Sequence, residues 1–455
     1  MKAIITILGL AFSLTASAQT KQAYEKSVLE EFQTDKFLAG GNLTDYDRLP
    51  RKTLTPTPKG YEPYYMSHYG RHGARWLLNE RDYTSPITTL RDAKKAGVLS
   101  AVGEKALAKL EEIAKGARGH YGDLSPLGEK EHHGIGKRMV QNFPEIFKTP
   151  NILIDARSTT SVRSILSMIG ECEELAQANP SARIHNEANE ANMSYMNAPK
   201  DGLARANEGK ARPIQNEWSA KMRDPRRLMK VLFTDQDWVY MNVMPTTLMG
   251  SIYDIAVNQQ IDDSNTELLD LFTVEELYRL WNGNNLYWYL NYGNAPQTGN
   301  AMPWQHANLL RNIIETADTV TQTQATLRFG HDTVVLPIIA LLELGGFNCS
   351  IDNLEELDTY FRSYQAVPYA CNVQLVFYRP KKGKAGDILV KALFNENEVS
   401  MPVETNMYPY YRWADVKAYY EAKLKKQPKS PFPAGAPAQE RQMPDFLRQM
   451  MNQNQ

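Results

Sequence analysis

The segment Arg71–Arg75 reads Arg-His-Gly-Ala-Arg and directly follows the strand-like run Tyr64–His68. A neutral imidazole can attack phosphorus when fixed positive charges already bind the phosphate, and arginine supplies a rigid, permanently charged group. Phosphate monoesters react so slowly that an enzyme has to lower the barrier by ~20 kcal/mol or more. The spacing predicts covalent phosphoryl transfer, with His72 as nucleophile and Arg71 and Arg75 as phosphate ligands. The alternative for this segment alone is a solvated basic turn.

A second segment adds another arginine. The apolar run at residues 152–154 leads into residues 155–163, which predicts a strand followed by a helix with Ser158 or Thr159 as N-cap. Helix N-termini attract anions through free N–H groups and the macrodipole. Arg163, in the first turns of this helix, is therefore a candidate phosphate ligand, although an ordinary capped helix with a surface arginine would have the same pattern.

A third segment ends a short strand at Gly330 and continues as an apolar helix from about Thr333 to Leu344. His331 is then expected at the carboxyl end of a strand, where open α/β sheets bind ligands. Asp332 has two interpretations: it caps the helix, or it is a carboxyl group that protonates a leaving alkoxide.

These three motifs occur in the order found in the histidine acid phosphatase branch (clade 2) of the histidine phosphatase superfamily, which contains phytases and multiple inositol polyphosphate phosphatases. The chain resembles that branch from about Tyr64 to about Asn395. The resemblance implies a phosphohistidine at His72, a proton donor at Asp332, and a phosphate site made of Arg71, Arg75, Arg163 and His331. It implies neither a metal ion nor another cofactor.

Two positions differ from patterns common in that family. Leu77 stands where a proline usually follows the first motif, and residues 331–333 read His-Asp-Thr. The inositol polyphosphate branch often has His-Ala-Glu there, whereas His-Asp is more typical of phytases and acid phosphatases. The downstream pair Leu336-Pro337 also occurs in inositol phosphatases of this branch. The motifs therefore imply the chemistry more sharply than they imply the substrate.

Positive charge is concentrated between residues 200 and 230. A solvated face is the default interpretation of such a run. If part of the run lies over the active site, it favours substrates that carry several phosphates. The basic residues are Lys200, Arg205, Lys210, Arg212, Lys221, Arg223, Arg226, Arg227 and Lys230.

Three functions fit these observations. The leading hypothesis is a phosphomonoesterase that acts on inositol polyphosphates such as phytate, and the second is a broad acid phosphatase for sugar phosphates. The third is an inactive relative that binds anions, although all six candidate residues are present. A mutase with the same histidine chemistry is also conceivable, but those enzymes lack a large inserted cap. The expected partner is a small phosphorylated molecule. The near balance of 51 basic and 52 acidic residues argues against nonspecific nucleic-acid binding.

The remaining histidines give no metal-site pattern. His132 and His133 are adjacent on a helix predicted to run from Pro126 to Phe147, so their side chains diverge by about 100° and cannot bind one ion. The others form no zinc-site spacing with cysteine or carboxylates. His306 is a candidate for the pocket lining by its spacing alone.

Alternating strand and helix patterns, interrupted by a mainly helical stretch, predict the architecture. Strand-like runs return at residues 326–329, 373–378 and 388–394. The chain is therefore expected to form a three-layer α/β/α sandwich core with an inserted, mostly α-helical cap domain. The core is assigned to residues 19–178 and 321–425, the cap to residues 179–320, and a C-terminal tail to residues 426–455.

The N-terminus has the features of a cleaved signal peptide in residues 1–18. Lys2 is basic, residues 4–14 are apolar, and Ala16-Ser17-Ala18 forms a cleavage site before Gln19. We expect a bacterial protein that is periplasmic or secreted. No later apolar run reaches the ~20 residues that span a bilayer.

Three cysteines, Cys172, Cys349 and Cys371, cannot all pair within one chain. Cys172 is expected to be a small buried side chain. A disulfide between Cys349 and Cys371 stays open, because the sequence does not place their Cα atoms. The sequence does not specify the oligomeric state either.

Overall fold

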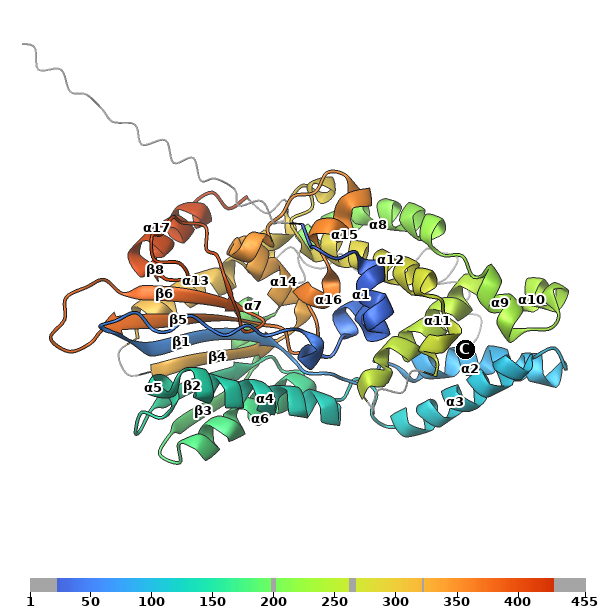
Figure 1. Ribbon diagram of the computed structural model, residues 1–455, viewed down its shortest axis with the longest axis horizontal. Coiled ribbons are helices and arrows are strands. Elements are labelled where there is room, and N and C mark those ends of the chain that lie inside the picture. The colour runs from blue at the N-terminus through green and yellow to red at the C-terminus, as the bar shows by residue number, and fades with distance from the viewer. Residues whose placement is uncertain (1–22, 198–201, 262–266, 321–322, 429–455) are drawn as a thin grey trace, which may run out of the picture.

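A twisted β-sheet lies at one end of the chain's computed structural model, which describes residues 23–197, 202–261, 267–320 and 323–428 (Figure 1). The signal peptide expected at residues 1–18 lies outside these ranges, as does all but residues 426–428 of the expected tail. Export and the tail-like end therefore stay predictions.

The sheet has a parallel half and an antiparallel half. Its strand order is β3-β2-β4-β1-β5-β6-β7, and β8 pairs with β6. Strands β3, β2, β4 and β1 run parallel to one another, whereas β5 and β6 are antiparallel to their neighbours. The strands are β1 (Tyr61–Arg71), β2 (Leu153–Ser158), β3 (Arg183–Ala188), β4 (Thr323–Gly330), β5 (Asn372–Pro380), β6 (Leu389–Phe394), β7 (Asn397–Val399) and β8 (Tyr411–Arg412).

Helices cover both faces of this sheet, because alternate strand residues are apolar on opposite sides. Met66 of β1 packs against α4 (Pro126–Asn142), α5 (Pro144–Phe147) and α6 (Val162–Ala178). Tyr65 and Tyr69 face the other way, toward α13 (Ala307–Asp318), α14 (Asp332–Leu341) and α17 (Trp413–Leu424). The predicted three-layer α/β/α core is confirmed.

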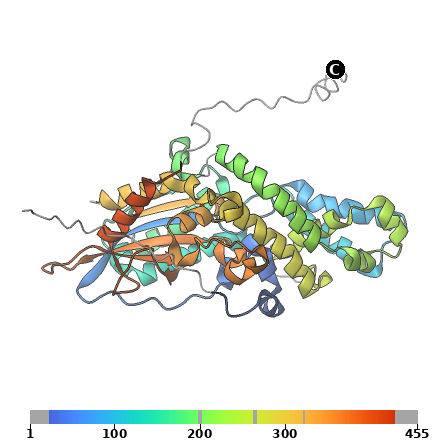
Figure 2. The same ribbon diagram turned by 90° about the horizontal axis from the view of Figure 1, so that it is seen from above.

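A helical arm extends from the carboxyl end of the parallel strands (Figures 1 and 2). Its helices bury apolar side chains, such as Tyr83, Ile87 and Leu90 on one face of the arm helix α2, and these side chains form a second hydrophobic cluster. The arm contains α2 (Glu80–Lys95), α3 (Ala101–Ala117), α9 (Arg226–Leu232), α10 (Gln236–Asn242), α11 (Pro245–Asn258) and α12 (Val274–Tyr292), and α8 (Gly202–Met222) packs against α12.

The arm differs in extent from the cap expected at residues 179–320. Helices α2 and α3, from the expected core, pack against α11 and α9. Conversely, β3 lies inside the expected cap but pairs with β2 at the sheet edge, and α13 covers the sheet. Amphipathic helices from both parts of the chain have the same periodicity, so only tertiary packing distinguishes core from arm.

The N-terminal segment lies between the sheet and the arm. It contains α1 (Val28–Thr34), η1 (Lys36–Leu43) and η2 (Tyr46–Arg48), and both α1 and η1 contact α12. The remaining short elements are η3 (Glu190–Asn192), α7 (Met193–Met196), η4 (Gln259–Ile261), η5 (Leu269–Leu271), η6 (Pro296–Thr298), η7 (Met302–His306), η8 (Leu344–Gly346), η9 (Leu354–Glu356), α15 (Leu357–Tyr360) and α16 (Ser363–Ala366).

Two local predictions were wrong at their ends. The helix expected from Pro126 to Phe147 breaks at Phe143, because Pro144 has no backbone N–H to continue it. The N-cap of α6 is Ser161 rather than Ser158 or Thr159, because β2 continues to Ser158.

Cys172, Cys349 and Cys371 form no disulfide with one another in this structure, and Cys172 and Cys371 are buried. Among the described residues, no helix is both long and apolar enough to cross a membrane.

Candidate active site

The three sequence motifs meet at the carboxyl ends of three adjacent parallel strands. Arg71 ends β1 opposite Gly330, the last residue of β4, and the His72 N–H donates to the Gly330 carbonyl at 2.9 Å. On the other side of β4, Ser158 of β2 pairs with Phe329. The segments that carry His72, His331 and Arg163 are therefore neighbours, although they lie far apart in the sequence.

The His72 imidazole is buried, with 3% of the residue exposed, and its tautomer is fixed by a hydrogen bond. Its Nδ1 lies 2.8 Å from the Gly73 carbonyl oxygen, which can only accept, so Nδ1 carries the proton and Nε2 has the free lone pair. Burial lowers the pKa of His72 well below its usual value, and the charges of Arg71 and other nearby cations lower it further. The ring is therefore a neutral base with one nitrogen available for attack.

The backbone after His72 is held tightly against the start of α4. A Cβ added to Gly73 would lie 2.4 Å from the Gly128 carbonyl oxygen, so no larger residue fits between these segments. The Gly73 N–H donates to Ser167 Oγ of α6 at 3.1 Å. Two helices on this face of the sheet, α4 and α6, thus contact the loop that carries His72.

Arg71 is fully buried and has several fixed contacts. Its Nη2 lies 2.8 Å from Asp332 Oδ2, and its Nη1 donates to the carbonyl oxygens of Val367, at 2.9 Å, and of Asn42. The guanidinium also lies 4.7 Å from the centroid of the Tyr369 ring. These contacts fix the direction of the guanidinium before any ligand binds.

Several cationic or basic groups face one another around His72. Arg163 is the second residue of α6, and burial, Arg75 and Arg71 lower its pKa. The rings of His72 and His331 lie 5.5 Å apart between centroids. Burial lowers the pKa of His331 to about 4, and Asp332 opposes this shift. Mutual repulsion of this kind favours the binding of an anion among these groups.

Two of the arginines have unused donors. The Nε atoms of Arg71 and Arg163 are buried and have no hydrogen-bond partner among the described residues. Buried polar atoms are nearly always hydrogen-bonded in folded proteins. Two unpaired donors beside a neutral imidazole indicate a binding site for an anion with several oxygens.

Asp332 is the first residue of α14, and the preceding His331 occupies the N-cap position. The simple capping interpretation is therefore insufficient. One carboxylate oxygen accepts the Thr333 N–H at 2.9 Å, and the other faces Arg71 and the Asn42 side chain. Burial raises the pKa of Asp332, but Arg71, Asn42 and other neighbours outweigh it, so the pKa lies below its usual value.

Asn42 belongs to the site but was missed by the sequence interpretation. Its Nδ2 donates to Asp332 Oδ2 at 3.2 Å, and its carbonyl oxygen accepts from Arg71. The only local signal is Gly40-Gly41: Gly41 has φ 58°, and a Cβ there would lie 2.8 Å from Asn284 Oδ1. A lone asparagine 290 residues before its partner has no motif to identify it.

Replacing Asn42 with alanine should shift the pH dependence of hydrolysis upward. The lost N–H donor stabilises the charged form of Asp332, so its removal raises that pKa and extends the protonated form to higher pH. For an ester with a poor leaving group, we expect the fall of kcat/KM with rising pH to begin at a higher pH. The maximal rate should change by less than about tenfold. Asn242→Ala, on the exposed face of α10, is the control and should leave the profile unchanged.

His132, His133 and His306 have partners other than the groups around His72. His132 is buried against Glu171, with 2.7 Å from Nδ1 to Oε1, and His133 pairs with Glu174. His306 is buried and has a backbone hydrogen bond with Thr333, next to Asp332. Within the described residues, no group of three or more His, Cys, Asp or Glu side chains could hold a metal ion.

Much of the basic run at residues 200–230 is paired with carboxylates. Lys200 lies outside the described residues. Three exposed pairs support the solvated-face interpretation for this part of the run: Arg212 with Glu208, Lys221 with Glu355, and Arg226 with Asp224. In a fourth pair, Arg227 binds the buried Glu276.

Comparisons with known proteins agree with this geometry. The family model described as "Histidine phosphatase superfamily (branch 2)" matches residues 70–395. Two solved structures of the Bifidobacterium longum multiple inositol polyphosphate phosphatase have a similar fold. The complex with inositol hexasulfate has a TM-score of 0.66 at 17% identity and covers 90% of this chain and 98% of that chain. The phosphate complex has a TM-score of 0.67 at 16% identity, covering 90% and 97%.

A phytase of *D. castellii* is also similar. Its TM-score is 0.63 at 15% identity, and the match covers 87% of this chain and 88% of that chain. A comparison with curated proteins found no match.

Proposed function

The chain belongs to branch 2 of the histidine phosphatase superfamily, and from that premise we propose that it hydrolyses inositol polyphosphates, phytate among them, through a phosphohistidine. Hydrolysis of phosphate monoesters is the chemistry of this family, and the site has the parts for it. The observation that carries the proposal is the neutral, tautomer-fixed His72 surrounded by Arg71, Arg75 and Arg163.

In the first step His72 Nε2 attacks phosphorus, and the bond to the ester oxygen breaks. The Gly73 carbonyl holds the proton on Nδ1, so the ring becomes positively charged as the new P–N bond forms, and that carbonyl stabilises the charge. Asp332, in its protonated form, gives its proton to the departing alkoxide. A poor leaving group such as an inositol hydroxyl needs this proton.

The positive groups around His72 bind the phosphoryl group through both steps. A pair of unit charges at about 4 Å contributes roughly 4 kcal/mol at an effective dielectric constant near 20. The buried Arg71, fixed by Val367 and Asn42, loses little freedom when it binds. Such preorganised charge is the largest contribution expected in phosphoryl transfer.

In the second step a water molecule attacks the phosphohistidine and releases inorganic phosphate. Asp332 is now ionised and takes the proton of that water, which returns the carboxyl group to its starting form. The leaving nitrogen is Nε2, and His72 returns to the neutral tautomer that it has in this structure.

Binding of the substrate would itself favour the protonated form of Asp332, because it raises the pKa of that carboxyl group. In this structure Arg71 and Asn42 hold the pKa of Asp332 below its usual value. A phosphate dianion close to Asp332 disfavours the carboxylate and draws on the same Arg71 guanidinium. Both effects raise the pKa of Asp332 when substrate binds, so proton uptake accompanies binding.

The substrate assignment is tested by phosphate release from phytate, glucose 1-phosphate and a simple aryl phosphate, without added metal. A marked preference for phytate in kcat/KM supports the inositol polyphosphate proposal. Similar values on all three esters would indicate a broad acid phosphatase instead. Release from none of them, by a protein that still binds inorganic phosphate, would indicate an anion-binding relative without activity.

A further inference from the structure

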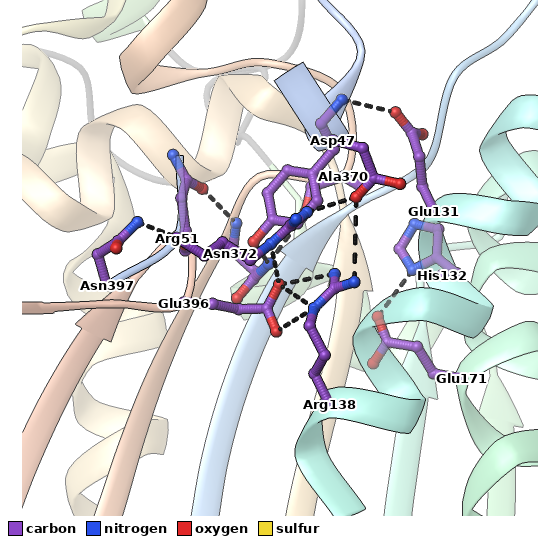
Figure 3. A network of polar contacts seen from close by, with 12 residues as sticks. Asp47, Arg51, Glu131, His132, Arg138, Glu171, Ala370, Asn372, Glu396 and Asn397 are labelled. Atoms are coloured by element: carbon purple, nitrogen blue, oxygen red, sulfur yellow. Dashed lines mark hydrogen bonds and ion pairs between the residues drawn. The ribbon is translucent and has the colours of Figure 1, made fainter. Parts of the chain in front are cut away.

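Glu131 is a fully buried residue of α4, and its carboxyl group contacts the loop that follows His72. Its Oε2 accepts the Ala74 N–H at 2.6 Å, and its Oε1 accepts the Tyr46 N–H at 2.9 Å. In Figure 3 Glu131 points from α4 toward the N-terminal segment, while the next residue, His132, points toward Glu171. Both oxygens of one carboxylate are thus used by backbone groups of two separate segments.

One of these segments carries the predicted nucleophile, His72, and the other carries Asn42, which contacts the predicted proton donor, Asp332. Ala74 is two residues after His72, and the intervening Gly73 carbonyl fixes the tautomer of His72. Tyr46 is four residues after Asn42, whose side chain contacts Asp332. A single side chain therefore connects the nucleophile loop with the segment that contacts the proton donor.

The N-terminal segment is also anchored by charged contacts just after Tyr46. Arg51 forms ion pairs with Asp47 and Glu396, and Arg138 of α4 has a bidentate contact with Glu396 (Figure 3). The segment around Tyr46 is therefore held at several points. A displacement of Glu131 would move Tyr46 and, through the short stretch of backbone between them, Asn42.

The chemistry of the contact requires a carboxylate. Each oxygen of Glu131 accepts one backbone N–H, so the contact needs two acceptor atoms. Burial and the nearby Asp45 raise the pKa of Glu131 well above its usual value, and the two N–H donors partly oppose this shift by stabilising the charged form. A glutamine of the same shape offers one acceptor oxygen and one NH₂ group. In either orientation its NH₂ would face the N–H of Ala74 or of Tyr46, so one of the two segments would lose its contact.

We propose that Glu131 is a positioning residue for phosphoryl transfer, whose carboxylate sets the distance between the His72 loop and the Asn42 segment. This inference rests on the proposed function and deepens it. Small displacements of reacting groups are costly, because a shift of about 1 Å can lower a rate by about 10²-fold.

The test compares Glu131→Gln with Glu171→Gln. Glu171 is an equally buried carboxyl group in the same helical layer, but its carboxylate contacts the His132 side chain rather than a loop of the site. On an aryl phosphate, Glu131→Gln should lower kcat by about 10- to 100-fold, with little change in KM. Glu171→Gln should lower the thermal midpoint but leave kcat close to the wild-type value. Glu131→Asp, which keeps two acceptors on a shorter side chain, should recover part of the lost kcat.

A parallel loss of kcat in Glu131→Gln and Glu171→Gln, in proportion to lost stability, would show a purely structural role and overturn the proposal. Hydrogen–deuterium exchange of the peptides that contain Ala74 and Tyr46 provides a readout independent of turnover. We expect faster exchange at one or both amides in Glu131→Gln only. If these amides exchanged in Glu131→Gln at the same rate as in the wild type, the proposal would also be overturned. This readout does not depend on activity, so it decides the role of Glu131 even if the wild-type protein released no phosphate and the proposed function failed.

Discussion

Replacing His72 with alanine should abolish phosphate release, with a fall in kcat of at least about 10⁴-fold on every substrate. The alanine side chain has no lone pair to attack phosphorus. A water molecule in the vacated space would not be oriented for attack, whereas the Gly73 carbonyl orients the imidazole of His72. The measurement is steady-state phosphate release, combined with rapid acid-free quenching to trap a phosphoenzyme. A phosphoramidate that is stable in alkali should form in the wild type and be absent from the variant.

His185→Ala is the matched control for this change. His185 is exposed on the edge strand β3 and should contribute nothing to turnover. Thermal unfolding of both variants separates chemistry from folding, because His72 is buried and its loss removes packing as well. A His72→Ala variant that retained a tenth of the wild-type rate would exclude His72 as the nucleophile.

Replacing Asp332 with asparagine should produce a loss that depends on the leaving group. On an alkyl phosphate, kcat should fall by about 10²- to 10⁴-fold, because the departing alkoxide then receives no proton. On an aryl phosphate with an acidic phenol, the first step needs no proton, and the loss should be much smaller. The measurement is a series of kcat values for esters that differ in the pKa of the leaving alcohol. Equal losses across the series would mean that Asp332 acts only by positioning Arg71.

The pH dependence of the wild type provides a second check on Asp332. Its pKa is lowered in the free protein, so the protonated fraction falls as pH rises above that value. The pKa of His72 is also lowered, which keeps the nucleophile neutral at mildly acidic pH. We therefore expect kcat/KM for an alkyl phosphate to increase from pH 7 toward pH 5, and Asp332→Asn to lose this dependence.

The local parts of the site could be predicted from the sequence, because each motif follows a strand and precedes a turn or helix. His331 was expected at the carboxyl end of a strand, where such sheets bind ligands, and the family resemblance implied that His72, Arg163 and His331 share one phosphate site. Asn42 and Glu131 could not be found in this way. Their partners lie 290 and 57 residues away, and their contacts involve backbone groups or a single side-chain pair that leave no pattern.

The extent of the arm was unpredictable for a related reason. The apolar stripe of α2 is the same whether it packs on a sheet or on another helix. Only the contacts of α2 and α3 with α11 and α9 assign them to the arm. Strand β3 was not predicted for the same reason. Its six residues pair with β2, although they lie in a region of the sequence that is otherwise mainly helical.

The contacts of Arg71 also govern when the site can exist during folding. Its guanidinium is held by carbonyl groups that lie 29 residues before it, in the N-terminal segment, and 296 residues after it, shortly before β5. Contacts between such distant segments form late, because closing a long loop costs chain entropy before it gains contacts. A chain that has collapsed only around its arm, or around one half of its sheet, has no preorganised anion site. Enzymatic turnover is therefore a property of the completely folded polypeptide, and recovery of activity reports the last long-range closure rather than the first compaction.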